Sequence, residues 1–189
     1  MLSVIIPTRD SERAVVATLS PLVSGATTGL ITEVILADGG SQDDTAAVAD
    51  VAGCRFMAVD GSLAVRFKAA AAAARAPWLL FLRPGTVLDA AWTDEVGRFV
   101  QQGSPDRRAA VFRRGRPSEP VLREMLSLVA AAFGRPPHPA QGLLISKQFY
   151  AALGSHSERA ADPETDLIRR IGRSRIVRLS TSAFTDILD

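Results

Sequence analysis

Short apolar runs alternate with segments of helical periodicity along the first hundred residues. Four short apolar runs predict strands; they cover residues 2–7, 32–38, 55–60 and 78–82. The first two runs are typical of strands buried on both faces of a sheet. Three intervening segments favour helices; they cover residues 11–24, 45–52 and 63–75. Ser11 and either Asp43 or Asp44 are suited to cap the first two helices. This alternating order predicts a parallel sheet with right-handed crossovers and helices on both faces.

The pattern is less regular after Trp92. A helix, a strand and an amphipathic helix are predicted at residues 90–100, 110–115 and 119–133. A proline-rich stretch then cannot be helical. A strand leading into a helix, a further helix and a last strand are predicted at residues 142–153, 163–172 and 175–180. We therefore expect one α/β domain over residues 1–189 with an elaborated C-terminal half.

Composition places the chain among soluble globular proteins. A length of 189 residues suits one domain with a sizeable core. The content of 47% hydrophobic and 22% charged residues is ordinary for a globular protein. The formal charge of +2 is too small to indicate a nucleic-acid partner. The single cysteine, Cys54, excludes an internal disulfide, fits a reducing compartment and is expected to act as a small apolar residue. We find neither a signal peptide at the N-terminus nor an apolar window of membrane-spanning length, so we expect a cytoplasmic protein.

Polar residues follow three of the predicted strands, where an open parallel sheet binds its ligands. The first two strand ends carry Pro7, Thr8, Arg9, Asp38, Gly39, Gly40 and Ser41. An aspartate in this place can bond a base or a ribose, and paired glycines let backbone amides approach a ligand. A tight turn followed by a helix cap explains the same loop equally well. The fourth strand ends in Arg83, Pro84 and Gly85.

Three stretches, in their order and spacing, resemble the family 2 glycosyltransferases with the GT-A fold. They are "LSVIIPTRDSE", "EVILADGGSQDDT" and "AAAARAPWLLFLRPGTVLDAAW". The chain is most similar to a short bacterial subgroup with an Asp-Gly-Gly-Ser loop. Residues 139–154 and 163–176 extend the resemblance over nearly the whole chain. It implies an α/β three-layer sandwich around a mostly parallel sheet.

The resemblance also implies transfer of a sugar from a nucleoside-diphosphate donor, with uridine favoured, to an unknown acceptor. Residues 1–92 would form the nucleotide-binding half and residues 93–189 the acceptor-side half. Asp38, with the end of the first strand, would hold the nucleoside. Asp166, or alternatively Glu164, would be the catalytic base. The binding residues implied are Pro7, Thr8, Arg9, Asp38, Gly39, Gly40, Ser41, Lys68, Arg83 and Gln141.

The chain departs from the family where a metal ion is expected. An Asp-x-Asp motif at the end of the fourth strand usually holds Mg or Mn, but its positions are Arg83 and Gly85 here. Neither supplies the oxygen ligands that these ions need, so no metal ligand is predicted. Three further family positions differ. An asparagine is replaced by Lys68, an arginine by Leu63 and an aspartate by Ala140.

Two accounts of Arg83 stay open at this point. A permanently charged guanidinium, with Lys68 or Arg66, could neutralise a leaving diphosphate in a metal-independent transferase. Alternatively, the metal site has decayed and the chain is a noncatalytic nucleotide-sugar binder or a partner protein. Asp89, a conceivable substitute ligand, fits better as a helix cap.

The remaining features favour ordinary surface or core roles. Five arginines without interleaved aromatics fit a solvated basic face better than an RNA site; they are Arg107, Arg108, Arg113, Arg114 and Arg116. His138 and His156 have no cysteine partner, so zinc is not expected. The apolar stripe of residues 119–133 fits core or an interface, which leaves a homodimer and a peripheral membrane association open.

Overall fold

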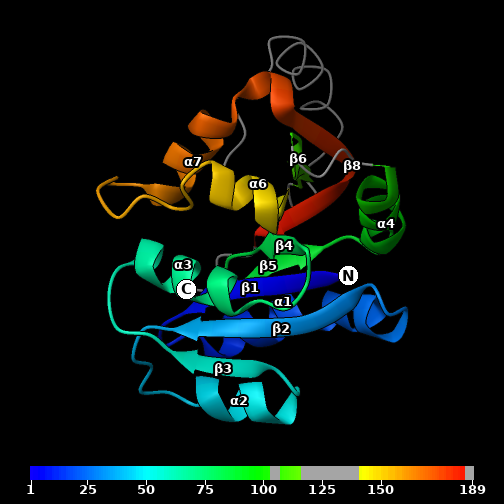
Figure 1. Ribbon diagram of the computed structural model, residues 1–189. Helices are drawn as coiled ribbons and strands as arrows, with labels where there is room; N and C mark the ends of the chain where they lie inside the picture. The colour runs from blue at the N-terminus through cyan, green and yellow to red at the C-terminus, as the bar shows by residue number, and fades with distance from the viewer. Residues whose placement is uncertain (103–106, 116–140, 186–189) are drawn as a thin grey trace, which may run out of the picture.

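The computed structural model describes residues 1–102, 107–115 and 141–185. Within them, one mixed, mostly parallel sheet has the strand order β3-β2-β1-β4-β7-β6-β8-β5 (Figure 1). The strands are β1 (Leu2–Thr8), β2 (Ile31–Asp38), β3 (Arg55–Ala58), β4 (Trp78–Phe81), β5 (Thr86–Leu88), β6 (Ala109–Arg114), β7 (Leu143–Ser146) and β8 (Ile176–Thr185). The helices are α1 (Glu12–Thr27), α2 (Thr45–Val51), α3 (Leu63–Ala73), α4 (Trp92–Gln102), α6 (Lys147–Ala152), α7 (Pro163–Ile171) and the 3-10 turn η2 (Arg173–Arg175).

The first four strands are all parallel, as the sequence predicts. β1 lies between β2 and β4, and β3 pairs with the outer edge of β2. Every residue of β1 is buried, which explains its largely apolar sequence. Each fully buried Val, Leu or Ile contributes about 1.5–3 kcal/mol relative to an exposed one. The carboxyl ends of these strands therefore meet at one edge of the sheet, to which the arrowheads of β2 and β3 point in Figure 1.

Helices cover both faces of the sheet and give three layers. Side chains of α1, α2 and α4 pack on one face, and those of α3, α6 and α7 pack on the other. Trp92 is fully buried in the first layer, where its Nε1 donates to the Pro21 carbonyl of α1 at 3.0 Å. A Cβ on Gly25 would come within 2.6 Å of that indole ring, so the glycine permits close packing of the two helices.

The second half of the chain extends the sheet beyond β4. β7 pairs antiparallel with β4, and β6 lies between β7 and β8. The strand predicted at residues 175–180 is confirmed but continues to Thr185, because β8 pairs first with β6 and then with β5. The sequence did not predict β5, whose three residues are too few to show a period.

Some helix ends differ from the sequence expectation, as the start of α1 and the end of α3 show. Ser11 holds the N-cap position of α1, but its hydroxyl donates to the Arg9 carbonyl instead of accepting from the helix. Asp43 caps the helix instead: its Oδ2 accepts a hydrogen bond from the Glu12 amide at 2.9 Å. α3 ends at Ala73, before the predicted residue 75, since the backbone turns extended at Ala74.

Some expectations lie outside the described residues: the helix at 119–133, the proline-rich loop, Ala140, His138 and Arg116. Of the helices that the structure does describe, none has the length and apolar composition needed to cross a membrane.

Candidate functional site

Asp38 is the central residue of the loop that follows β2. The residue is 2% exposed, and each of its carboxylate oxygens accepts two hydrogen bonds. Oδ1 accepts from the hydroxyls of Thr8, at 2.8 Å, and Ser41. Oδ2 accepts from the amides of Gly40 and Ser41, at 2.9 and 2.8 Å. Burial by itself raises the pKa of Asp38, but these hydrogen bonds outweigh it and lower the pKa, so the carboxylate is ionised.

These contacts occupy the carboxylate of Asp38 and the glycine amides of its loop, which the sequence assigned to a ligand. A carboxylate has about four acceptor positions, and the four bonds to Asp38 fill them. The Gly39 amide donates to the Thr8 carbonyl at 2.9 Å. Gly40 has φ of 91°, a conformation that favours glycine. The loop is thus a self-contained turn, and Asp38 shapes the edge of the sheet rather than offering free acceptors.

The loops after β1 and β2 are joined to each other. The Asp10 carboxylate accepts from the Gln42 amide at 2.6 Å, and the Asp10 amide donates to the Ser41 hydroxyl at 2.8 Å. Of the predicted β1 residues, Pro7 and Thr8 are buried, whereas Arg9 is exposed. The edge at β1 and β2 is therefore rigid, with Arg9 as its accessible cation.

Arg66 of α3 brings a second cation to this edge. Its Nη1 donates to the Thr8 carbonyl at 2.7 Å, and a Cβ on Gly39 would lie 2.9 to 3.2 Å from atoms of its guanidinium group. Burial lowers the pKa of Arg66, nearby Asp38 raises it and Arg9 lowers it further. From the sequence, Arg66 was expected to have only an auxiliary role. The clue to its place is that it lies about one helical turn after Leu63, the position at which the family has an arginine.

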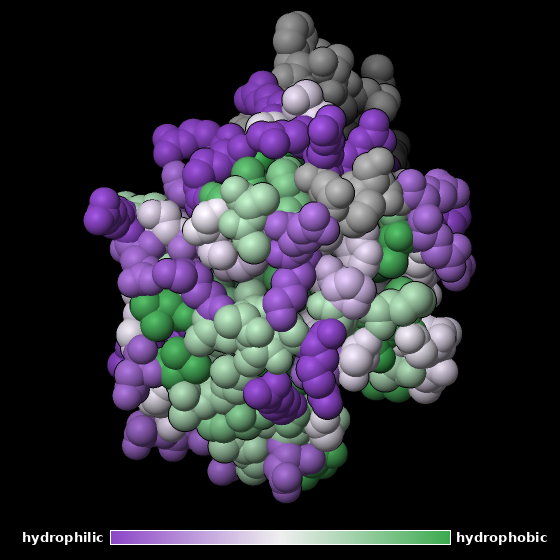
Figure 2. Space-filling view, viewed as in Figure 1, coloured by the Kyte–Doolittle hydropathy of each residue, from purple (hydrophilic) through white to green (hydrophobic). Residues whose placement is uncertain are grey.

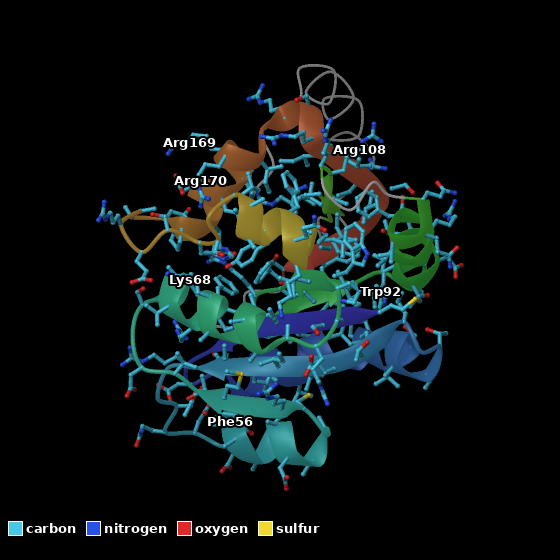
Figure 3. The ribbon with its side chains drawn as sticks, in the orientation of Figure 1. Phe56, Lys68, Trp92, Arg108, Arg169 and Arg170 are labelled. Atoms are coloured by element: carbon cyan, nitrogen blue, oxygen red, sulfur yellow. The ribbon has the colours of Figure 1, made fainter. Side chains whose placement is uncertain are left out.

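Lys68 lies apart from these groups. It forms an ion pair with Glu158, and both side chains are largely exposed. Figure 3 shows Lys68 on α3, on the side of the molecule where Arg169 and Arg170 project from α7. The surface above α7 is strongly hydrophilic in Figure 2.

Arg83, at the end of β4, forms an ion pair with Glu164. Its Nε lies 2.8 Å from Glu164 Oε2, and its Nη2 donates to the same oxygen. The Glu164 side chain is only 9% exposed, whereas that of Arg83 is 43% exposed. Burial acts to lower the pKa of Arg83, but Glu164 and Asp162 outweigh it and raise the pKa. Arg83, which the sequence assigned to the diphosphate, is thus bonded to Glu164, the alternative candidate for the base.

A small hollow adjoins this ion pair. It is lined by Phe81, Gly142, Leu143, His156, Glu164 and Ile168. The His156 ring stacks on Phe67 with centroids 4.5 Å apart, and its Nδ1 lies 2.7 Å from the Tyr150 hydroxyl. Burial lowers the pKa of His156 to about 3 and raises the pKa of Tyr150 to about 12, so both are neutral at pH 7. No role for His156 was expected from the sequence, because two of its aromatic neighbours, Phe67 and Phe81, are far away along the chain.

Asp166 points away from the Arg83–Glu164 pair. Residues two positions apart on a helix project about 200° from each other. Accordingly, the Asp166 carboxylate bonds Arg169 Nη2 and Arg170 Nε, each at 2.8 Å. Hydrogen bonds from these two arginines lower the pKa of Asp166. The structure therefore does not bring the two candidate bases together.

Gln141 and Asp89 have structural contacts. Gln141 is buried, and its Nε2 donates to the Phe112 carbonyl of β6 at 2.7 Å. The Asp89 carboxylate accepts from the amides of Ala91 and Ser182. It therefore steadies the start of α4 against β8, in keeping with the cap interpretation.

The described residues do not fit the metal ion of the family. Gly85 is buried, and its amide donates to the Ala14 carbonyl of α1 at 3.0 Å. Arg83 holds the place of the other ligand and is paired with Glu164. Over residues 1–102, 107–115 and 141–185, no three His, Cys, Asp or Glu side chains are grouped so that they could hold a metal ion. At this position a guanidinium–carboxylate pair is found instead.

The fold and the sheet edge define an α/β protein of the GT-A-like class, as expected from the sequence. Residues 3–83, less than half of the chain, match the sequence model of the family described as Glycosyl transferase family 2. The matched segment runs from β1 to Arg83. No curated protein sequence matches the chain.

Solved structures share the fold at low sequence identity. S. aureus TarS 1-349 in complex with UDP superposes with a TM-score of 0.73 and 14% identity over 97% of this chain. Glucosyl-3-phosphoglycerate synthase from Mycobacterium tuberculosis, in complex with Mn2+, UDP and glucosyl-3-phosphoglycerate, has a TM-score of 0.69 and 18% identity over 100% of this chain. The chain covers 59% of the TarS structure and 73% of the synthase structure. At such identities the likeness establishes the fold alone.

Proposed function

We propose that this protein is a family 2 glycosyltransferase that transfers a sugar from a nucleoside-diphosphate donor without a divalent metal ion. The observation that carries the proposal is the placement of Arg83. Its exposed guanidinium stands at the carboxyl end of β4, in the position of a metal ligand, beside the buried Glu164. The family match over residues 3–83 supports the transferase class, and the UDP in the TarS and synthase structures supports a uridine donor.

The reaction needs one bond exchange and one proton transfer. An acceptor hydroxyl oxygen attacks the anomeric carbon of the donor, the bond from that carbon to the diphosphate breaks, and the nucleoside diphosphate departs with the electron pair. A carboxylate takes the hydroxyl proton. Arg83 would stabilise the negative charge on the leaving diphosphate, which is the main electrostatic demand. Asp166 is the first candidate for the base and Glu164 the second.

A second candidate is a noncatalytic nucleotide-sugar binder or partner protein. The ion pairs of both candidate bases favour it, because a carboxylate engaged by arginine is a weak proton acceptor. The self-contained turn at Asp38 favours only the partner protein, because the Asp38 carboxylate has no acceptor position left for a nucleoside. This candidate predicts donor binding without turnover.

The test is calorimetric titration of UDP, UDP-sugars and GDP-sugars in EDTA and then in Mn, followed by assay of UDP release from each donor that binds. Binding in EDTA with UDP release that falls at least 10-fold in Asp166→Asn or Glu164→Gln supports the transferase. Binding without release supports the noncatalytic candidate. Absence of binding under both conditions refutes the donor site.

A further inference from the structure

We infer that Glu164 holds Arg83 in place, and that the two side chains together form a fixed anion-binding unit for the donor diphosphate. In this assignment Glu164 is a positioning residue and not the base. The inference rests on the proposed function and gives one residue of its site a different role.

The geometry leaves Arg83 able to bind a second anion. A guanidinium has five N–H donors, and the two bonds to Glu164 Oε2 use one from Nε and one from Nη2. Three donors have no partner among the residues that the structure describes. The Arg83 side chain is 43% exposed and that of Glu164 is 9% exposed, so a ligand reaches the cation and not the carboxylate. Planar donors of this kind suit two phosphate oxygens.

The charge of the unit matches that of the metal site it replaces. A divalent ion held by two carboxylates has zero net charge, as has a guanidinium held by one. Both bind phosphate through the open positions of a fixed cation. Asp162 adds a negative charge nearby, but its carboxylate accepts from the Glu164 and Thr165 amides and the Thr165 hydroxyl at the start of α7.

The same contacts argue against Glu164 as the base. Protonation of the Glu164 carboxylate would weaken two hydrogen bonds to a permanently charged group and remove the counter-ion of Arg83. An arginine that must face a diphosphate gains more from a rigid anchor, because less side-chain entropy is then lost on binding.

A double-mutant cycle on UDP and inorganic diphosphate binding in EDTA tests this assignment. We expect Arg83→Ala and Glu164→Ala each to weaken UDP binding roughly 10- to 100-fold, the range for a charged hydrogen bond. The double variant should bind no more weakly than the weaker single variant, because both changes disable one unit. Glu164→Gln, which keeps the shape of the side chain, should give a smaller loss and serves if Glu164→Ala does not fold.

Arg98→Ala and Asp94→Asn are the matched controls, since they make the same charge changes on α4 and should leave binding unchanged. Wild-type affinity in both Glu164 variants would overturn the inference and leave the donor proposal standing. UDP binding only with Mn would overturn both the inference and the metal-independent donor proposal. Binding of inorganic diphosphate that depends on both residues, without any binding of UDP or GDP compounds, would refute the donor proposal and keep the Arg83–Glu164 unit. Absence of binding by either ligand refutes both.

Discussion

At the scale of single residues, the glycines after β2 are explained by their neighbours. The Arg66 guanidinium packs on Gly39, where a Cβ would lie 2.9 Å from Nη1. That guanidinium also donates a hydrogen bond to the Thr8 carbonyl, and the negative charge of Asp38 attracts it. Gly39 is therefore small so that an arginine can reach the end of β1, a reason different from the ligand contact that the sequence suggested.

Replacing Gly39 by alanine should displace Arg66 and break its bond to Thr8. We expect Gly39→Ala to lower the free energy of unfolding by roughly 1 kcal/mol, the net value of one hydrogen bond. Gly97→Ala is the control, because a Cβ at this position in α4 meets no atom within 4 Å; it should stabilise by about 0.5–1 kcal/mol. Urea unfolding measures both. Equal stability of Gly39→Ala and wild type would show that Arg66 does not depend on this glycine.

The sequence located the candidate residues but not their contacts. Thr8, Asp38 and Arg83 do lie at the carboxyl edge of the sheet, because strand ends can be predicted from apolar runs. The pairing of Arg83 with Glu164 joins positions 81 residues apart, and no local pattern carries that information. Whether the predicted site residues bind a donor stays a prediction.

At the scale of elements, Glu95 fastens α4 to β8. Its carboxylate accepts from the amides and the hydroxyls of both Ser180 and Thr181. Burial raises the pKa of Glu95, but these bonds outweigh it and lower the pKa to about 2. A helix and a strand about 85 residues apart in sequence are thus joined by one side chain.

Glu95→Gln should destabilise the protein, because the amide keeps only one acceptor oxygen. We expect a loss of roughly 1–2 kcal/mol at pH 7, which allows for solvent screening. The folded pKa lies below the unfolded value of 4.5, so the contribution is complete above pH 4.5 and is lost as the pH falls toward 2.

Denaturant unfolding of wild type and Glu95→Gln between pH 7 and 3 measures this effect. The difference in stability should shrink below pH 4.5, and a constant difference would contradict the assignment. Asp94→Asn, one residue earlier on α4, makes the same charge change and should have little effect at any pH.

At the scale of the whole molecule, the aromatic cluster around His156 joins segments that the sequence treats separately. His156 precedes α7, Phe67 lies in α3, Phe81 in β4 and Tyr150 in α6. The strand order across β7, β6 and β8 likewise depends on long-range pairing. The strand order of the parallel first half can be predicted from its alternating local patterns. The strand order of the second half cannot, because packing between distant segments decides which strands pair and in which direction.

His156 should make folding sensitive to mild acid. Burial in the folded protein lowers the pKa of His156 from its ordinary value of 6.5 to about 3. The unfolded chain therefore binds the extra proton, and stability falls as the pH drops from 6.5 toward 3, by up to about 1.4 kcal/mol per pH unit.

His156→Phe keeps a ring beside Phe67 and removes this titration. The free energy of unfolding should therefore fall less between pH 7 and 5 in the variant than in wild type, as measured by urea titration at each pH. Parallel pH profiles would contradict the assignment, because they would mean that His156 takes up its proton equally in the folded and the unfolded protein.

The joined loops after β1 and β2 have a consequence for the timing of local motion. The amides of Gly39, Gly40, Ser41 and Gln42 all donate to groups within this edge. Loop amides commonly exchange their hydrogens with solvent almost freely, whereas here four in succession are held. In deuterated water this glycine-rich turn should retain its protons for as long as the neighbouring strands, and lose them only when the edge of the sheet opens as one body.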